Sequence, residues 1–516
     1  MRGLFGKKLV IGALVILALG AVYALAGLSH PVALAAGRPA PPPRRAPVTT
    51  AIRACPSPGS GGAGGVAIIA AATGTGQASL ASAGTAVVSR LSAAGSASAG
   101  PPLITLSRPG VLTAAAVRTA AAQSGLPASG SQSAAGGTVL AGPSRGGVIV
   151  RATGSMARAL AVEQTGAGGL PTALCNSPGT DFWFVGPGQR GLASLQLYLM
   201  NTDGQPADAE IDIYTDSGPL LGSTDTGIAV PAHGLLVQSL AKLVHGSRVV
   251  ALHVRTSVGR LVAALRETNS ASQQGAWLPA SQPPARSLVL PGLPASAGRR
   301  ELYVAVPGAG NAQVKVTAVT AKGSYQPTGG GGIDLPGGSA VLVPLPSLAG
   351  AAAAVRIASD VPVTAAMLAS GGPPGAPGVF TAASAPIEEQ GVIADNLSGS
   401  GDASTLVLSA PRAAAQVRIT EEGTAAGQQP GTGSQAARVI SITAKHTVTV
   451  RLHAPSGSAA RSPFAVVITP LAGSGPVYAG RVLVRSGTVE SIFPVLSSLT
   501  SVPLPPVRDS LATVLP

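Results

Sequence analysis

Aromatic and charged side chains are scarce in this sequence. Only 3% of the 516 residues are Phe, Trp or Tyr and only 10% are charged, while the mean hydropathy is +0.39. Disordered chains combine low hydrophobicity with high charge, so this composition argues against full disorder. Gly and Pro contribute 68 and 45 residues, which leaves little room for long helices. The chain is too long for one core, and we expect an all-β fold built from several modules.

Acidic residues are missing from the first third of the sequence. Asp and Glu begin at Glu163, whereas 13 of the 34 Lys and Arg residues lie before it. The net charge of +14 is therefore mainly a property of the N-terminal part. Nucleic-acid binders gather their cations on one face, whereas these cations are mostly separated from one another along the chain. We expect no nucleic-acid partner.

A long uncharged run lies near the N-terminus. Leu9 to Leu28 holds 20 residues without a charge and follows a flank with three cations. A helix of this length spans the core of a bilayer, and a cationic flank keeps its end in the cytoplasm. We expect residues 1–30 to form a cytoplasmic tip and a single-pass signal anchor that contacts the lipid bilayer. The rest of the chain would be extracytoplasmic. Cleavage of a signal peptide near Ala35 is the alternative.

Residues 31–53 are rich in Pro and Arg and predict an extended stalk without a core of its own. Its arginines could contact anionic lipid or envelope polymer, but we favour a solvated linker.

Only two cysteines are present, Cys55 and Cys175. In an exported chain, a single pair without CxxC spacing favours a disulfide over a metal or redox site. Two free structural thiols are the alternative. A bridge would enclose the first folded module.

A pattern of two β-rich runs joined by a short turn with Gly or Pro recurs four times along the sequence, and each copy ends a module. A second signature is Leu195-x-Leu197-x-Leu199-x-Asn201, followed by Ala209-x-Ile211-x-Ile213, and related runs begin at Leu302 and Leu406. Alternation with period two places these apolar side chains on one face of a sheet. Each unit has room for about seven strands, the number typical of an immunoglobulin-like sandwich, although a propeller with four blades is an alternative. We therefore predict four tandem β-sandwich modules and an extended C-terminal tail. Their predicted ranges are 54–175, 176–275, 276–372, 373–485 and, for the tail, 486–516.

The plan as a whole resembles a known group of proteins. The anchor, the Pro-rich stalk, Cys55-Pro56, a second Cys before Phe182-Trp183-Phe184 and the sandwich repeats are similar to an uncharacterised family of anchored, secreted proteins from high-GC Gram-positive bacteria. The resemblance covers nearly the full chain. It implies a location and a fold, and it implies no chemistry.

Several catalytic and ligand motifs match by pattern alone. Gly142-Pro143-Ser144-Arg145-Gly146 fits GxSxG, but a β-rich run follows where a nucleophile elbow requires a helix. The GxGxxG matches at Gly59 and Gly186 do not open helices either. The six histidines form no constellation in the sequence. We therefore expect a protein that is not an enzyme and has no cofactor.

Two groups of residues remain as candidate sites. Asp208, Glu210 and Asp212 alternate along one strand; they could form a calcium site, but we favour a solvent-facing sheet edge. The aromatic residues could form a small sugar-binding patch, but we favour core packing. The patch would contain Phe182, Trp183, Phe184 and Trp277.

The sequence leaves two functions open. We favour a membrane-anchored envelope protein that acts as a spacer or interaction scaffold for an envelope protein, for example in the assembly of a surface polymer. The alternative is a surface module that binds glycan or anionic wall polymer through its arginine-bearing first part.

Overall fold

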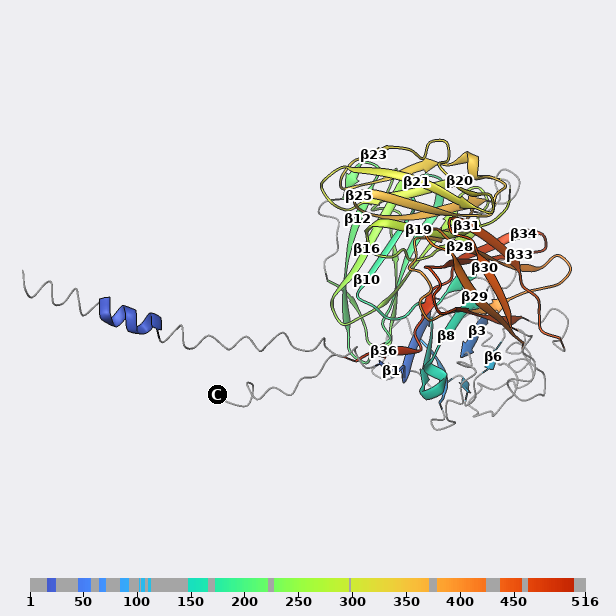
Figure 1. Ribbon diagram of the computed structural model, residues 1–516, viewed down its shortest axis with the longest axis horizontal. Coiled ribbons are helices and arrows are strands. Elements are labelled where there is room, and N and C mark those ends of the chain that lie inside the picture. The colour runs from blue at the N-terminus through green and yellow to red at the C-terminus, as the bar shows by residue number, and fades with distance from the viewer. Residues whose placement is uncertain are drawn as a thin grey trace, which may run out of the picture. The chain divides into compact units, whose positions relative to one another are not determined.

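The computed structural model describes residues 16–24, 45–56, 65–70, 84–91, 102, 104–106, 110–112, 147–165, 172–220, 227–296, 298–370, 378–423, 437–456 and 463–504. The chain divides into two units, one formed by residues 1–46 with 503–516 and the other by residues 47–502 (Figure 1). In the first unit, residues 16–24 are helical and exposed. No helix in the described ranges combines the length and apolar character needed to cross a bilayer. The rest of the run from Leu9 to Leu28 lies outside the described residues.

The second unit is built from β-strands, which confirms the predicted all-β class. Its strands group into four sandwiches, which we call sandwiches 1 to 4; three of them are pairs of separate sheets, and in sandwich 3 the two sheets share one strand. Sandwich 1 contains the 3-10 helix Gly154–Ala157 and strands β2 to β9. These are β2 (Thr50–Cys55), β3 (Gly65–Ala70), β4 (Ala86–Arg90), β5 (Ile104–Leu106), β6 (Gly110–Leu112), β7 (Val148–Thr153), β8 (Leu160–Thr165) and β9 (Ala173–Leu174).

Sandwich 2 has two sheets around a core that includes Phe184, Leu197 and Leu252. The strand orders are β10-β16-β12-β13, with β14 beside β12, and β15-β11-β17-β18. The bounds are β10 (Asp181–Pro187), β11 (Leu192–Met200), β12 (Ala207–Thr215), β13 (Gly218–Pro219), β14 (Ile228–Val230), β15 (Leu235–Ser239), β16 (Val249–Val258), β17 (Val262–Asn269) and β18 (Gly275–Leu278).

In sandwich 3 the 18-residue strand β25 passes from one sheet to the other. Its first part pairs with β19 and β21, and its second part pairs with β20 and β26. The bounds are β19 (Ala285–Leu293), β20 (Arg300–Val306), β21 (Ala312–Thr320), β22 (Gly323–Tyr325), β23 (Ile333–Leu335), β24 (Ser339–Pro344), the 3-10 helix Pro346–Leu348, β25 (Ala353–Ser370) and β26 (Gly378–Ala382).

Sandwich 4 has the strand orders β30-β29-β32-β27-β35 and β31-β28-β33-β34. Its bounds are β27 (Gln390–Asn396), β28 (Ala403–Ala410), β29 (Ala415–Gly423), β30 (Arg438–Ile442), β31 (His446–Arg451), β32 (Phe464–Pro470), β33 (Tyr478–Arg485), β34 (Thr488–Pro494) and β35 (Ser497–Ser498). Two further short strands are β1 (Arg45–Pro47) and β36 (Ser501–Pro503).

The alternating sequence patterns produce the buried faces of these sheets. In β12, Ala207, Ala209, Ile211 and Ile213 are buried and alternate with half-buried Asp208, Glu210 and Asp212. Strands β21 and β29 occupy the place in their sheets that β12 has in sandwich 2. Buried and more exposed side chains also alternate along the first part of each of these strands. Period-two patterning therefore selects which side chains enter each core.

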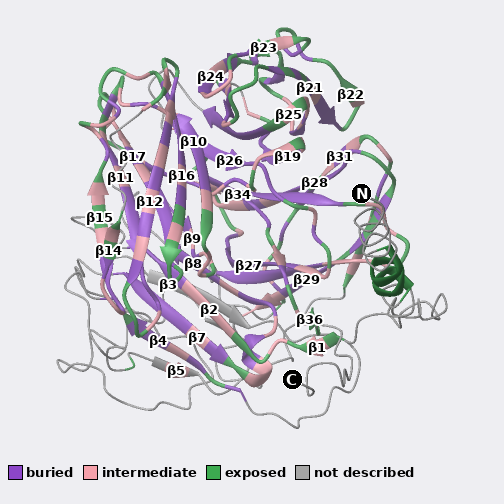
Figure 2. Cartoon of the chain, turned by 90° about the vertical axis from the view of Figure 1, so that its left-hand side faces the viewer, coloured by how far each residue is buried: buried purple, intermediate pink, exposed green. Residues whose placement is uncertain are grey.

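The sandwiches pack against one another in a closed series of contacts within residues 47–502. Sandwich 1 meets sandwich 2 around Tyr198 and Trp277, and sandwich 2 shares a core with Tyr303 and Phe380 of sandwich 3. Sandwich 3 shares a core with Val482 and Ile492 of sandwich 4. Sandwich 4 returns to sandwich 1, where Val392, Ala394 and Val467 contact Ala159. Figure 2 shows buried strands throughout this unit.

The strand pairing extends beyond several of the predicted ranges. β2 begins at Thr50, inside the segment predicted as a stalk. β26 lies in the predicted range 373–485 but pairs with β25 of the range before it. β34 lies in the segment predicted as a tail but pairs with β33 of the last predicted module. The module boundaries themselves remain predictions.

Candidate functional site

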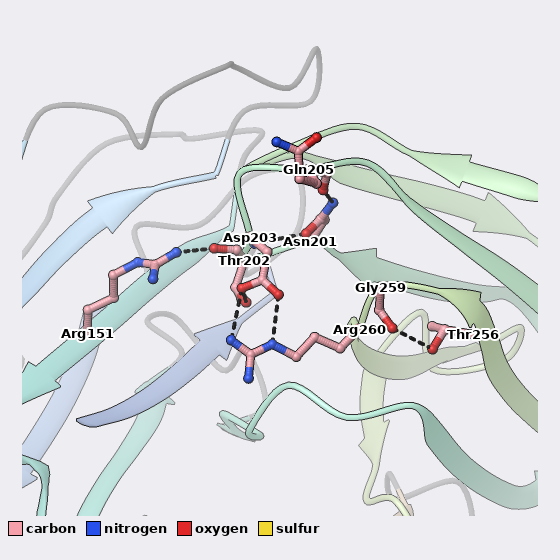
Figure 3. A network of polar contacts seen from close by, with 8 residues as sticks. All are labelled: Arg151, Asn201, Thr202, Asp203, Gln205, Thr256, Gly259 and Arg260. Atoms are coloured by element: carbon pink, nitrogen blue, oxygen red, sulfur yellow. Dashed lines mark hydrogen bonds and ion pairs between the residues drawn. The ribbon is translucent and has the colours of Figure 1, made fainter. Parts of the chain in front are cut away.

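The LxLxLxN signature ends in a structural asparagine. Asn201 follows β11 and is fully buried. Its Nδ2 donates to the carbonyl of Gln205 at 2.7 Å, and its Oδ1 accepts from the backbone N–H of Asp203 at 2.9 Å (Figure 3). The amide thus satisfies two backbone groups within the loop after β11, as an Asx-turn does.

This loop also connects sandwich 2 to sandwich 1. Arg260 donates two hydrogen bonds to the carboxylate of Asp203, from Nε to Oδ2 at 2.7 Å and from Nη2 to Oδ1 at 3.0 Å (Figure 3). The hydrogen bond from Arg260 lowers the pKa of the Asp203 carboxyl. Arg151 of β7 donates to the carbonyl of Thr202. The network holds the loop in place between the two sandwiches, and the carboxylate of the loop, that of Asp203, is paired with Arg260.

A buried ion pair joins sandwich 1 to sandwich 4. Arg481 Nη2 donates to Glu163 Oε2 at 2.7 Å, and Arg481 Nη1 donates to the carbonyl of Asp395 at 2.8 Å. The other carboxylate oxygen of Glu163 accepts from the backbone N–H of Ala394 at 2.9 Å. Burial raises the pKa of Glu163, and the charge of Arg481 opposes that shift. Burial also raises the pKa of Asp395. The partners lie on β8, β27 and β33, so the pair requires the two sandwiches to be in contact.

A second buried acid lies where sandwich 2 meets sandwich 3. Glu267 of β17 is 5% exposed, and burial raises its pKa to about 8. The charge of Arg299 opposes this shift, and that of Glu301 adds to it. Beside it, Tyr303 donates to Glu301 Oε2 at 2.8 Å. The carboxyl of Glu267 is therefore protonated at a pH at which an exposed glutamate is charged.

Sandwich 3 and sandwich 4 approach each other through glycine backbones. A Cβ on Gly480 would lie 2.3 Å from the Cα of Gly292, which itself has a φ of +90°. Thr447 Oγ1 donates to the carbonyl of Val319 across the same contact at 2.7 Å. Only residues without a side chain allow this approach of β19 to β33.

The predicted disulfide is confirmed. Cys55 at the end of β2 and Cys175 just after β9 are bonded, with their Cα atoms 4.5 Å apart. Both residues belong to the core cluster of sandwich 1. The bond links the first strand of one sheet to the end of the other across 120 residues.

The structure does not gather the four candidate aromatic residues into one patch. Phe184 lies in the core of sandwich 2, and Phe182 packs against that core. Trp183 points to the other face of β10, because neighbouring side chains alternate, and it stacks on His253 with ring centroids 4.0 Å apart. Trp277 lies in a different cluster and contacts Tyr198.

The acidic strand β12 carries ion pairs on its outer face. Arg255 Nε lies 2.9 Å from Glu210 Oε2 and 3.7 Å from Asp212 Oδ2. The ring nitrogens of His253 lie 3.1 Å from Asp181 and 3.3 Å from Asp212. Within the described ranges, no group of three or more His, Cys, Asp or Glu residues is placed to hold a metal ion.

Some sequence motifs cannot be placed. The GxSxG match at 142–146 and the GxGxxG match at 59–64 lie outside the described residues. The second GxGxxG match begins at Gly186, near the end of β10, and ends at Gly191 in the turn before β11.

Glu163, Arg481 and Glu267 were missed as site residues. Glu163 and Arg481 are each a lone charge in or beside an apolar run, such as Leu160-Ala161-Val162 before Glu163, whereas Glu267 directly follows Arg266. An isolated charge in a strand that is otherwise apolar is the signal that could have identified Glu163 and Arg481, because such a charge needs a buried partner.

The architecture defines an all-β protein of repeated antiparallel sandwiches that pack on one another. Residues 128–460 match a family of unknown function (DUF5719), and the chain belongs to that family. No curated protein and no solved structure matches the sequence.

Proposed function

We propose that this chain is a non-enzymatic, membrane-anchored protein of the cell envelope, and that its four sandwiches form a rigid scaffold for an envelope partner. The observation that carries this proposal is the closed series of contacts, in which Glu163 and Arg481 tie sandwich 1 to sandwich 4. A closed series fixes surfaces from four sandwiches relative to one another, as a platform for a partner requires.

The cysteine pair supports a location outside the cytoplasm. Disulfides persist in oxidising compartments, and the bond between Cys55 and Cys175 is nearly inaccessible to solvent. The uncharged run from Leu9 to Leu28 supports attachment to the membrane with an extracytoplasmic head. Fractionation of the native cells tests this part. We expect the protein in the membrane fraction with residues 1–35 retained, and a mature form starting near Ala36 in the medium would contradict it.

We propose further that the sandwiches are immunoglobulin-like. In sandwich 2, β11 pairs with β15 and β12 pairs with β16, as strands B with E and C with F do in immunoglobulin domains. The outer strands are exchanged between the sheets, because β10 pairs with β16 and β17 pairs with β11.

Substitutions in the native host test the scaffold role. Arg481→Glu places two carboxylates together at the contact between sandwiches 1 and 4, and we expect it to abolish any phenotype that depends on the protein. His253→Ala and Asp212→Ala change the outer face of sandwich 2, and we expect both to leave that phenotype intact. If either of these abolishes the phenotype while the protein remains folded and exported, its function requires chemistry at that residue and the scaffold proposal fails.

A further inference from the structure

A cavity of about 110 Å³ lies between sandwich 1 and sandwich 4. Its wall is mainly apolar and is formed by β8, β27 and the segment that includes the end of β34. Among the residues that the structure describes, the charged ones in the wall are Arg53, Glu163 and Arg481. Because Glu163 and Arg481 pair with each other, the charge of Arg53 is the one left unbalanced.

Arg53 has N–H donors that are not used in hydrogen bonds to the described residues. Its Nη1 donates to the carbonyl of Ile52 at 3.1 Å and to Ser177 Oγ. Within the described part of the chain, no carboxylate pairs with it, and its Nε and Nη2 make no hydrogen bond. Burial lowers the pKa of Arg53 to about 10, so the side chain is still a cation at neutral pH. Arg53 is half-buried, so the free edge of its guanidinium can pair with an anion that enters the cavity.

A second observation comes from a smaller cavity of about 20 Å³ next to the first. The two share Leu174, Asn176 and Phe493 in their walls. The smaller one reaches Trp277, which is 7% exposed and whose Nε1 is buried without a hydrogen-bond partner among the described residues. Trp277 therefore lies beside the site, where its N–H can report on a bound ligand.

We propose that these adjacent cavities bind a short-chain organic carboxylate, with the carboxylate on the free edge of Arg53 and the hydrocarbon part against Leu174 and Phe493. The planar guanidinium edge matches a carboxylate with two parallel bonds. The apolar wall suits a short chain and is a poor environment for a phosphate dianion. Since a cavity of about 150 Å³ holds benzene, this site has room for about four to six non-hydrogen atoms. The proposal goes beyond the scaffold role and does not depend on it.

Titration of the full-length protein with butyrate tests the proposal. The chain has two Trp residues, so the indole N–H region of an NMR spectrum contains two signals, and Trp277→Phe assigns them. We expect butyrate to shift the Trp277 signal in a saturable way and to leave the signal of Trp183 unchanged. The neutral isostere butyramide should cause no saturable shift, and inorganic phosphate should not compete with butyrate.

Matched variants decide whether Arg53 binds the anion. Arg53→Gln should weaken butyrate binding by at least about tenfold, because it removes a charged hydrogen-bond donor. Arg53→Lys keeps the charge without the planar edge, and its affinity for butyrate should lie between those of the unmodified protein and Arg53→Gln. Arg418→Gln removes an exposed arginine of β29 and should bind like the unmodified protein. Thermal unfolding and mapping of the disulfide show whether each variant is folded.

Three results would overturn the proposal. These are the absence of a saturable shift with butyrate, equal binding of butyramide, and unchanged affinity in folded Arg53→Gln. Binding of phosphate in place of butyrate would show a site for inorganic anions and would also contradict it.

Discussion

Glu163 accepts a hydrogen bond of 2.7 Å from Arg481, which lies 318 residues further along the chain, and both side chains are shielded from solvent. The pair bridges sandwich 1 and sandwich 4, the first and last sandwiches in sequence order. A buried charge is costly unless its partner is present. Contact between these sandwiches is therefore built into the stability of the fold.

Glu267 makes stability depend on pH. Its pKa is raised to about 8 in the folded protein, so between about pH 4.5 and 8 the folded state binds a proton that the unfolded state releases. We expect the free energy of unfolding to fall as the pH rises through this window, by at most about 1.4 kcal/mol per pH unit for this group.

Urea unfolding at several pH values measures this slope. Glu267→Gln should reduce it, since a neutral side chain no longer titrates. Glu388→Gln changes an exposed carboxyl and should preserve the slope. An unchanged slope in Glu267→Gln would show that this carboxyl is not responsible.

Gly480→Ala should weaken the contact between sandwich 3 and sandwich 4. The added Cβ would collide with the backbone of Gly292, which cannot move aside as a flexible side chain can. We expect a loss of about 1–3 kcal/mol in the free energy of unfolding, as for other overpacked sites.

Gly308→Ala is the control, because a Cβ there meets no atom within 4 Å. Its stability should differ from that of the unmodified protein by less than about 0.5 kcal/mol. Equal stabilities of the two alanine variants in urea unfolding would argue against the backbone contact.

Removal of the disulfide should destabilise the protein. The bond closes a loop of 120 residues, and loss of a native disulfide typically costs about 2–5 kcal/mol. We expect Cys55→Ser with Cys175→Ser to lower the free energy of unfolding by an amount in this range. Because both residues lie in the core of sandwich 1, amide hydrogen exchange should increase there first. Exchange that increases first in sandwich 3 would contradict this placement.

The sequence contains strong local signals for the strands and the disulfide. Alternation along Ala207–Thr215 shows which face is buried, and a single cysteine pair has one intramolecular solution. It contains weaker signals for long-range contacts. The predicted aromatic residues do not form one patch in the structure, because Phe184 and Trp183 point to opposite faces of β10 and Trp277 belongs to another cluster.

The contacts between sandwiches depend on residues far apart in the chain. Nothing near Glu163 indicates that its partner is Arg481, although a lone charge in an apolar strand indicates that a partner must exist. In the same way, Gly480 resembles any strand glycine until the backbone of Gly292 is placed beside it. Such pairings follow from how the sandwiches are packed, which local patterning does not determine.

A double-mutant cycle on Glu163 and Arg481 tests the closed arrangement most directly. The free energy of unfolding would be measured for the unmodified protein, Glu163→Leu, Arg481→Met and the double variant. Each single change leaves an unpaired buried charge and should cost about 3–5 kcal/mol, whereas the double change should cost much less than the sum. We predict a coupling energy of about 2 kcal/mol or more. Costs that add to within about 0.5 kcal/mol would show that the two residues do not touch and would contradict a closed series of sandwiches.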